Sequence, residues 1–173
     1  MTYNIDHVNE ITEGLYLGNL FTANNIEILK NLGITKVLSL IERFRIPKFN
    51  EQDNIKHKVI LINDSLQENI IKYFGECLNF IIGEEKVLVH CAAGTSRSAT
   101  IVIAYLMWKN KEMTFEKVFN YVKEKRPVVN PNLAFQDQLQ LFEKILKEND
   151  YDIDKIKFNE IEWKPKEGGY FFN

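Results

Sequence analysis

A cysteine and an arginine stand six positions apart, at Cys91 and Arg97, and small or hydroxyl residues fill positions 92–96 between them. An apolar run at 87–89 leads into this stretch, and a long apolar helix pattern at 98–108 leads out of it. A turn at a helix N-terminus directs backbone N–H groups and positive potential at one point, which suits an oxyanion. Arg97 adds a planar fork of donors. In this field Cys91 is favoured as a thiolate, so the residues predict a nucleophilic sulfur aimed at a bound phosphate.

The elements around this stretch alternate between strand and helix patterns. β-branched and apolar runs predict strands, and apolar residues at helical spacing predict helices. The expected strands are 11–18, 34–41, 58–62 and 86–89, and the expected helices are 19–32, 67–82, 98–108, 114–122 and one that begins at Pro131. Residues 42–56 are polar and aperiodic, as in a loop. This alternation predicts an α/β fold, with a mostly parallel sheet flanked by helices on both faces.

Length and composition limit the class of protein. The chain has 173 residues, enough for one domain of ordinary size, with 45% apolar and 27% charged residues. The net charge of −2 argues against a general nucleic-acid or membrane-surface binder. The two cysteines, Cys77 and Cys91, do not form a disulfide framework, and no apolar run reaches the length of a membrane span. Residues 1–6 resemble no signal peptide and position 2 is not glycine, so we expect no membrane anchor and a cytoplasmic location, with nuclear entry left open.

The last 25 residues differ from the rest of the chain. From Asn149 they are rich in charges and aromatics, which are Tyr151, Phe158, Trp163, Tyr170, Phe171 and Phe172. We interpret residues 1–148 as the catalytic domain and 149–173 as a tail. Because so many aromatic side chains rarely stay in water, the tail either packs on its own body or contacts a partner or a second copy.

The stretch around the cysteine resembles a known active-site motif. His90-Cys91-Ala92-Ala93-Gly94-Thr95-Ser96-Arg97-Ser98 matches His-Cys-x-x-Gly-x-x-Arg-Ser of the cysteine-dependent protein phosphatases. The surroundings resemble the dual specificity phosphatases in particular, over roughly residues 9–147. The matching segments are 11–18, 33–38, 64–74, Arg126-Pro127 and 131–139. The resemblance implies that family's five-stranded sheet and its phosphatase activity, with no metal or cofactor.

The resemblance also implies a role for each matching residue. Cys91 would attack phosphorus, while Arg97 and the backbone N–H groups of Ala92, Ala93, Gly94, Thr95 and Ser96 would bind the phosphate. Asp64 would protonate the leaving oxygen and later activate water, and Ser98 would hydrogen-bond the sulfur. His90 would orient the loop, and Asn132 would tie it to the last helix. Plainer interpretations remain for two of these residues: Asp64 as a helix cap and Ser98 as the first residue of a helix.

Other interpretations of the cysteine stretch are a buried core cysteine, a rhodanese-type sulfur carrier and an inactive scaffold. A phosphate-recognising binding module is the chief non-enzymatic alternative. The variable loop positions Ala92, Ala93, Thr95 and Ser96 carry no charge, which favours a phosphorylated protein over a phosphoinositide. The sequence lacks an aromatic-capped segment that would deepen the pocket, so phosphotyrosine and phosphoserine or phosphothreonine are all expected substrates.

Two further features leave alternatives open. Arg43 and Arg45 are half of the four arginines and lie with Lys48 in one loop, which is either a rim that attracts acidic or phosphorylated substrate or a plain solvated loop. Cys77 lies in a helix pattern among apolar residues. It is either a small apolar filler or a thiol that pairs with an oxidised Cys91.

Overall fold

The computed structural model describes residues 7–165, so Tyr170, Phe171 and Phe172 of the tail lie outside the described residues. Five strands form one sheet in the order β1-β2-β5-β3-β4. Their bounds are β1 Val8–Thr12, β2 Leu15–Gly18, β3 Ile34–Ile41, β4 Lys56–Leu61 and β5 Lys86–His90. Only the β1–β2 pair is antiparallel. The predicted five-stranded, mostly parallel sheet is confirmed.

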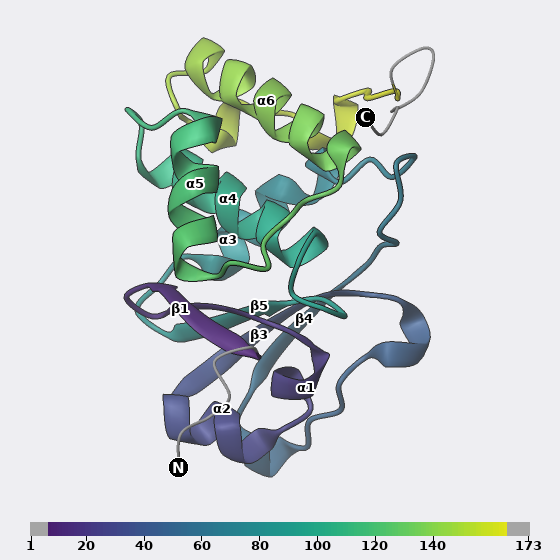
Figure 1. Ribbon diagram of the computed structural model, residues 1–173, viewed down its shortest axis with the longest axis vertical. Helices are drawn as coiled ribbons and strands as arrows, with labels where there is room; N and C mark the ends of the chain where they lie inside the picture. The colour runs from purple at the N-terminus through teal and green to yellow at the C-terminus, as the bar shows by residue number, and fades with distance from the viewer. Residues whose placement is uncertain (1–6, 166–173) are drawn as a thin grey trace.

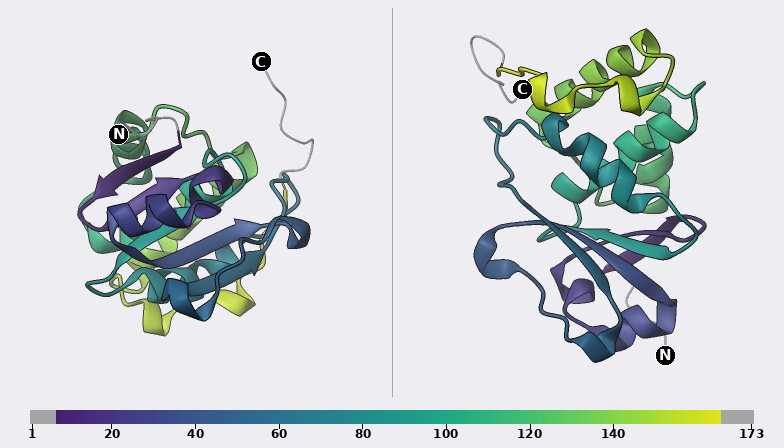
Figure 2. Two further views of the ribbon diagram at one scale, coloured as in Figure 1. Left: turned by 90° about the horizontal axis from the view of Figure 1, so that it is seen from below. Right: turned by 180° about the vertical axis from the view of Figure 1, so that it is seen from behind.

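Helices cover both faces of this sheet, as expected (Figures 1 and 2). The short helices α1 (Leu20–Ala23) and α2 (Ile26–Leu32) lie on one face. The other face carries α3 (Phe74–Ile81), α4 (Arg97–Lys109), α5 (Phe115–Lys125) and α6 (Leu133–Glu148). Short 3₁₀ turns fill the connections: η1 Arg43–Arg45, η2 Glu51–Asp53, η3 Ile71–Tyr73, η4 Ile153–Lys155 and η5 Phe158–Glu160.

The strands before the cysteine are buried on both sides because each face of the sheet is covered. Along β5, Val87 and Val89 pack into the large core under α3–α6, whereas Leu88 packs into the smaller core under α1 and α2. This two-sided burial explains the uninterrupted apolar run before the cysteine. Helix α4 lies inside the larger core, and its buried positions occupy nearly every side of the helix. A sequence without a polar face therefore marks the central helix of this layer.

Two predictions near the N-terminus were wrong in detail. Residues 11–18, expected as one strand, contribute to two antiparallel strands that reverse at Glu13-Gly14, where Gly14 has a φ of +75°. The stretch 19–32, expected as one helix, forms two. Asn25 ends the continuity because its side chain accepts a hydrogen bond from the Ile28 N–H and so caps a new helix.

The boundaries of three further elements were also misplaced. Strand β4 starts at Lys56, two residues earlier than expected, and ends at Leu61, one residue earlier than expected. The helix expected over 67–82 is regular only from η3 onward, and residues 62–70 run as an irregular connection. Helix α6 starts at Leu133, not at Pro131, because the side chain of Asn132 accepts a hydrogen bond from the Phe135 N–H and caps the helix.

The described part of the tail lies against the helical layer. Ile153 and Phe158 are buried in the larger core. The Phe158 ring fills a notch beside Gly75 of α3, where even a Cβ atom would overlap it. The Asn69 side chain donates to the Ile161 carbonyl (3.1 Å), just before η3. Residues 151–163 therefore pack against the body of the domain over its connection between β4 and α3.

Candidate active site

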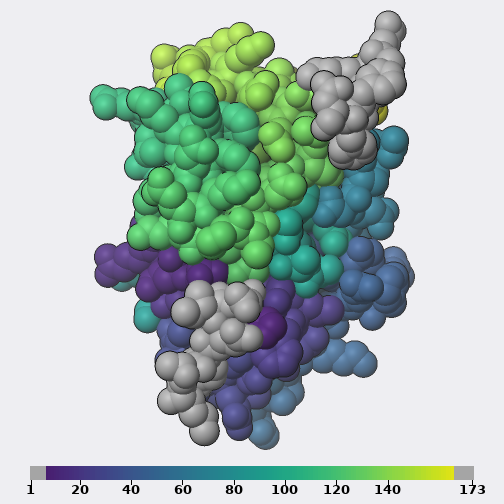
Figure 3. All heavy atoms as spheres, in the orientation of Figure 1, coloured from purple at the N-terminus to yellow at the C-terminus, as the bar shows by residue number. Residues whose placement is uncertain are grey.

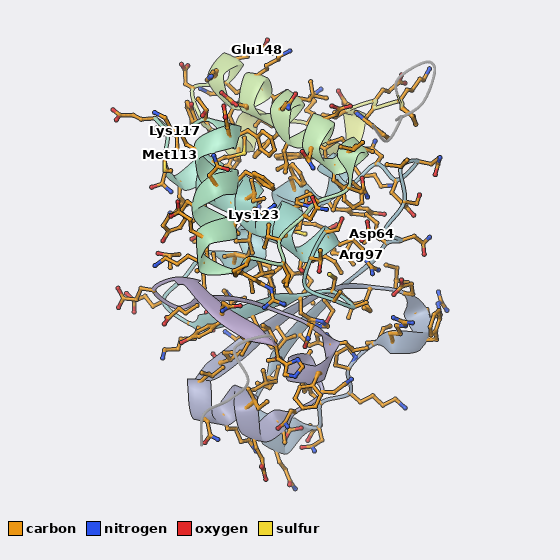
Figure 4. The ribbon with its side chains drawn as sticks, in the orientation of Figure 1. Asp64, Arg97, Met113, Lys117, Lys123 and Glu148 are labelled. Carbon is orange, nitrogen blue, oxygen red and sulfur yellow. The ribbon has the colours of Figure 1, made fainter. Side chains whose placement is uncertain are left out.

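The carboxyl ends of three neighbouring parallel strands meet at one edge of the sheet. There β5 runs into Cys91, β3 runs into Glu42, and the connection after β4 carries Asp64. Helix α4 begins above this edge at Arg97. Figure 4 shows Asp64 and Arg97 side by side although they are 33 positions apart in the sequence. Ligand sites of open parallel sheets lie at this edge, because loops from several strands converge on it.

The Cys91 sulfur lies inside a tight loop, and its residue is 1% exposed. It accepts hydrogen bonds from the Gly94 N–H and from the Ser98 hydroxyl, both at 3.2 Å. No side chain caps α4, because the hydroxyl of Ser96 turns away to Asp64. The positive end of this 13-residue helix therefore faces the loop. Two donors and a helix terminus at one sulfur are an arrangement that stabilises a thiolate.

The guanidinium of Arg97 is held from one side and open to an acceptor on another. Its Nη1 donates to the Ile62 carbonyl (3.1 Å) and pairs with Oε1 of Glu42 (3.0 Å). Its Nε is buried and has no hydrogen-bond partner among the described residues, and the nearest acid oxygen is Asp64 Oδ2 at 4.0 Å. A buried, unpaired donor is costly, so this N–H is suited to an anion in the loop.

Glu42, which sequence reasoning missed, is the carboxylate that positions Arg97. Partial burial by itself raises the pKa of Glu42. Hydrogen bonds from its own backbone N–H and from Arg97, together with the charges of Arg97 and Arg45, outweigh burial and hold that pKa below its ordinary value. Glu42 is therefore ionised at neutral pH and restrains the guanidinium electrostatically.

Asp64 is tied to the cysteine loop and does not cap a helix. Its Oδ1 accepts hydrogen bonds from the Ser96 hydroxyl and from the Asn132 side-chain amide, both at 2.8 Å. The backbone N–H of Asn132 also donates to the Ser96 hydroxyl oxygen (3.0 Å). Helix α3 has no side-chain cap, so the helix-cap interpretation of Asp64 was wrong. Asn132 joins the loop, the carboxylate and α6.

His90 is fully buried behind the loop and lies in a chain of hydrogen bonds. Its Nδ1 is 3.1 Å from the Cys91 carbonyl, and its Nε2 is 2.6 Å from the Ser39 hydroxyl. Burial, reinforced by the charge of Arg97, lowers the pKa of His90 to about 4, so the ring is neutral at pH 7. A neutral ring donates to the carbonyl from Nδ1 and accepts from Ser39 at Nε2. The Ser39 oxygen is then left to accept from His57 Nε2 at 2.8 Å.

Arg126 supports the loop from below and was also missed as a site residue. It is 1% exposed, and its guanidinium donates to the Gly94 carbonyl (2.9 Å), the Ala93 carbonyl (3.3 Å) and Asn9 (2.7 Å). The scarcity of arginine was the available signal, because only one other arginine lies outside the loop at 43–45. These bonds hold the Ala93 and Gly94 carbonyls away from the site. In a trans peptide the N–H points opposite to the carbonyl, so the N–H groups of the same two peptide units face the site.

The structure bears on both features that the sequence left open, the role of Cys77 and the loop that carries Arg43 and Arg45. Cys77 is fully buried in the larger core, and burial raises its pKa, which disfavours the thiolate needed for disulfide chemistry. Arg43 and Arg45 form η1 directly after Glu42 and are exposed. They therefore lie at the rim of the site.

Within residues 7–165, no three His, Cys, Asp or Glu side chains are grouped so as to hold a metal ion. In the same range, no helix is long and apolar enough to cross a membrane.

Comparison with known proteins agrees with this geometry. The family model for the dual specificity phosphatase catalytic domain matches residues 15–145. The chain belongs to the dual specificity phosphatase family. Dual specificity protein phosphatase 1 of Arabidopsis thaliana is 41% identical over 154 residues, which cover 86% of this chain and 76% of the relative. The family assignment from the motif and its flanking segments is confirmed.

Solved structures of dual specificity phosphatase-like proteins share the fold. The human tyrosine phosphatase-like serine/threonine/tyrosine-interacting protein aligns with a TM-score of 0.76 at 37% identity, over 82% of this chain and 99% of that one. The Yvh1 phosphatase domain of Chaetomium thermophilum aligns with a TM-score of 0.73 at 31% identity, over 80% and 96% of the two chains. The expected cysteine-phosphatase fold is therefore confirmed.

Proposed function

We propose that this dual specificity phosphatase hydrolyses phosphate monoesters on tyrosine and on serine or threonine of proteins, through a phosphocysteine intermediate. One observation carries the proposal. The Cys91 sulfur accepts two hydrogen bonds at the focus of a helix terminus and of Arg97, whose buried Nε has no hydrogen-bond acceptor within residues 7–165. A thiolate beside a phosphate-binding arginine is the requirement for this chemistry.

In the first step the phosphate lies in the loop formed by residues 91–97. Arg97 binds two of its oxygens, and the backbone N–H groups of Ala92 through Arg97 spread the remaining charge. The Cys91 sulfur forms a bond to phosphorus as the bond to the substrate oxygen breaks. Asp64 gives its proton to that oxygen, and the dephosphorylated hydroxyl leaves.

In the second step water replaces the sulfur on phosphorus. Asp64, now ionised, takes a proton from the attacking water, and inorganic phosphate and the Cys91 thiolate are released. The Ser98 hydroxyl, at 3.2 Å from the sulfur, stabilises the departing thiolate. Ser98 is the second residue of α4, so this serine is part of the helix and its hydroxyl also donates to the nucleophile.

Three further assignments belong to this proposal. Residues 1–148 form the catalytic domain, which agrees with a family match that ends at residue 145. Residues 149–173 form an extension of it, and the protein acts in the cytoplasm. A phosphoprotein is favoured over a phosphoinositide because Ala92, Ala93, Thr95 and Ser96 give the loop no cation for a second phosphate.

A phosphate-recognising module without turnover is the second candidate. One similar solved structure is described as phosphatase-like and as an interacting protein, so similarity of fold does not by itself indicate turnover. The residues favour the enzyme, because nucleophile, arginine, carboxylate and loop serine converge on one point.

Hydrolysis of p-nitrophenyl phosphate by the wild type and by Cys91→Ser tests the enzyme against the module. We expect turnover by the wild type, and a loss of at least about a thousandfold in Cys91→Ser, since serine is a far weaker nucleophile at neutral pH. Equal rates in the two proteins would contradict the proposal. A phosphopeptide that binds both proteins while neither turns over would favour the module.

A further inference from the structure

We propose that the substrate is a polypeptide that crosses the mouth of the site in one register. Acidic residues on one side of the phosphorylated residue lie over Arg43 and Arg45. An aliphatic side chain on the other side enters a groove beside Asp64. This inference rests on the proposed phosphatase function and names the kind of substrate that the site selects.

The basic side of the mouth is η1. Arg43 and Arg45 are exposed, and neither forms an ion pair with any described residue. Phe44 between them is 81% exposed, and the Arg45 guanidinium lies 5.5 Å from its ring centre. Two exposed cations without an ion-pair partner among the described residues, on either side of an exposed aromatic ring, complement a peptide that carries carboxylates.

The apolar side is a groove of about 500 Å³ between the connection after β4 and the start of α6. Its walls include Asp64, Leu66, Ser96, Pro131 and Leu133. Leu133, the first residue of α6, is 37% exposed there. The groove shares Asp64 and Ser96 with the active site, so a side chain next to a bound phosphorylated residue reaches it directly.

The two sides lie at different edges of one guanidinium. Arg97 contacts Glu42, the residue before η1, through Nη1 at 3.0 Å, and faces Asp64, a wall of the groove, through Nε at 4.0 Å. A phosphate on Arg97 is therefore flanked by cations on one side and by the groove on the other. In Figure 3 the teal atoms between the green helical layer and the blue connections after β3 and β4 form this region of the surface.

A polypeptide fits both sides better than a lipid surface does. Phe44 with its neighbouring arginines would also suit a membrane interface. The groove, however, is concave, and its volume of about 500 Å³ leaves ample room for an aliphatic side chain, whereas a flat bilayer has nothing to place in it. The loop also lacks a cation for a second headgroup phosphate.

The experiment compares phosphotyrosine peptides of one length. Two of them carry Asp or Glu on one side of the phosphotyrosine and Leu on the other. In one peptide the acidic residues precede the phosphotyrosine, and in the other they follow it. Their control has alanine at all flanking positions. The readout is kcat/KM for each peptide divided by kcat/KM for p-nitrophenyl phosphate, which contacts the loop alone. We expect a ratio about tenfold higher for one order of the acidic and aliphatic peptide than for the alanine peptide.

Variants of the enzyme show which part of the peptide preference comes from the arginines of η1 and which part comes from the groove. Arg43→Ala/Arg45→Ala should remove the benefit of the acidic residues only, and Leu133→Gln should remove the benefit of leucine only. Lys117→Ala/Lys123→Ala is the charge-matched control, because these exposed lysines lie on α5, across the molecule from Asp64 and Arg97 (Figure 4). The dissociation constants of the same peptides for Cys91→Ser repeat the measurement without turnover.

The outcomes separate this inference from the proposed function. If the kcat/KM ratios and the dissociation constants are the same for all flanking residues while p-nitrophenyl phosphate is hydrolysed, the proposed register is wrong and the proposed phosphatase activity stands. A wild type that hydrolyses nothing overturns the proposed function, and equal dissociation constants then overturn the register as well. Binding to phosphatidylcholine vesicles containing a phosphatidylinositol phosphate, lost in Phe44→Ala and without peptide preference, replaces the polypeptide with a lipid surface.

Discussion

Gly94 shows how one residue sets the path of the cysteine loop. Its φ is +70°, in the region that glycine adopts most readily. A Cβ atom at this position would overlap the Gly18 carbonyl of β2 and the guanidinium of Arg126. Its N–H donates to the Cys91 sulfur, and its carbonyl accepts from Arg126. The glycine is therefore required both for the backbone conformation and for the space between two neighbours.

Gly94→Ala should lower the free energy of unfolding by about 2 kcal/mol or more and reduce kcat strongly, because strain and overlap both displace the loop. Urea denaturation and p-nitrophenyl phosphate turnover measure the two effects. Gly14→Ala is the matched control, since Gly14 has a similar φ of +75° and its nearest neighbour atom is 3.9 Å away. If both variants lose the same stability and activity, overlap with Gly18 and Arg126 is not the cause.

Asp64 carries a prediction about pH. If Asp64 protonates the leaving group, kcat of the wild type falls toward high pH as the carboxyl ionises. Asp64→Asn should lower kcat and flatten this limb of the profile, because an amide does not titrate. The substitution keeps an oxygen that accepts from Ser96 and Asn132, so the loop stays in place. A basic limb of the same shape in both proteins would assign the proton to another group.

At the scale of elements, three strands share one buried hydrogen-bond chain. His57 on β4, Ser39 on β3 and His90 on β5 are linked through the Ser39 hydroxyl at 2.8 and 2.6 Å. The chain ends at the Cys91 carbonyl. Burial lowers the pKa of His57 below its ordinary value, and it lowers that of His90 to about 4. Neutral rings therefore link β4, β3 and β5 to the backbone at Cys91.

This hydrogen-bond chain of His57, Ser39 and His90 predicts a loss of stability in acid. His90 titrates near 6.5 when unfolded and near 4 when folded, so between these values the unfolded state binds more protons. The free energy of unfolding should therefore fall by about 3 kcal/mol as pH drops from 6.5 to 4, and His57 adds to the fall. Urea denaturation at a series of pH values measures it. In His90→Asn the fall should be smaller. An equal fall in both proteins would show that groups other than His90 cause it.

At the scale of the whole molecule, the tail completes the surface of the helical layer. Phe158 is 9% exposed, its ring lies 6.0 Å from that of Phe142, and it occupies the notch beside Gly75. The Trp108 indole N–H donates to the Tyr151 carbonyl (3.0 Å), near the start of the segment. Gly75 is the second residue of α3 and leaves the space that the Phe158 ring fills, so burial of this ring stabilises the contact between the tail and the helix.

Phe158→Ala should destabilise the fold by about 3 kcal/mol, because it removes a largely buried ring and leaves a cavity against α3 and α6. Chemical denaturation measures the loss. Asn159→Ala, which changes the exposed neighbour, should unfold like the wild type. Identical midpoints for all three proteins would mean that the tail does not add to the core.

Local patterns in the sequence were enough to predict the loop from His90 to Ser98, the strand before it, the central helix that follows and the class of the sheet. These features depend on spacing and periodicity within some twenty residues, where near neighbours in the chain are near neighbours in space. The family was readable for the same reason. The break at Asn25 and the start of α6 at Leu133, after its cap Asn132, were missed, because a side chain that caps a helix overrides the apolar spacing around it.

The distant residues that complete the site become apparent in the folded chain alone. Glu42 and Arg126 have no local pattern that distinguishes a structural ion pair from a solvated charge. Their partners, at Arg97 and at the Gly94 and Ala93 carbonyls, lie 55, 32 and 33 positions away. The groove beside Asp64 likewise exists only where the connection after β4 meets α6. Contacts of this range are set by the packing of whole elements, which determines the substrate surface around a loop that the sequence already specifies.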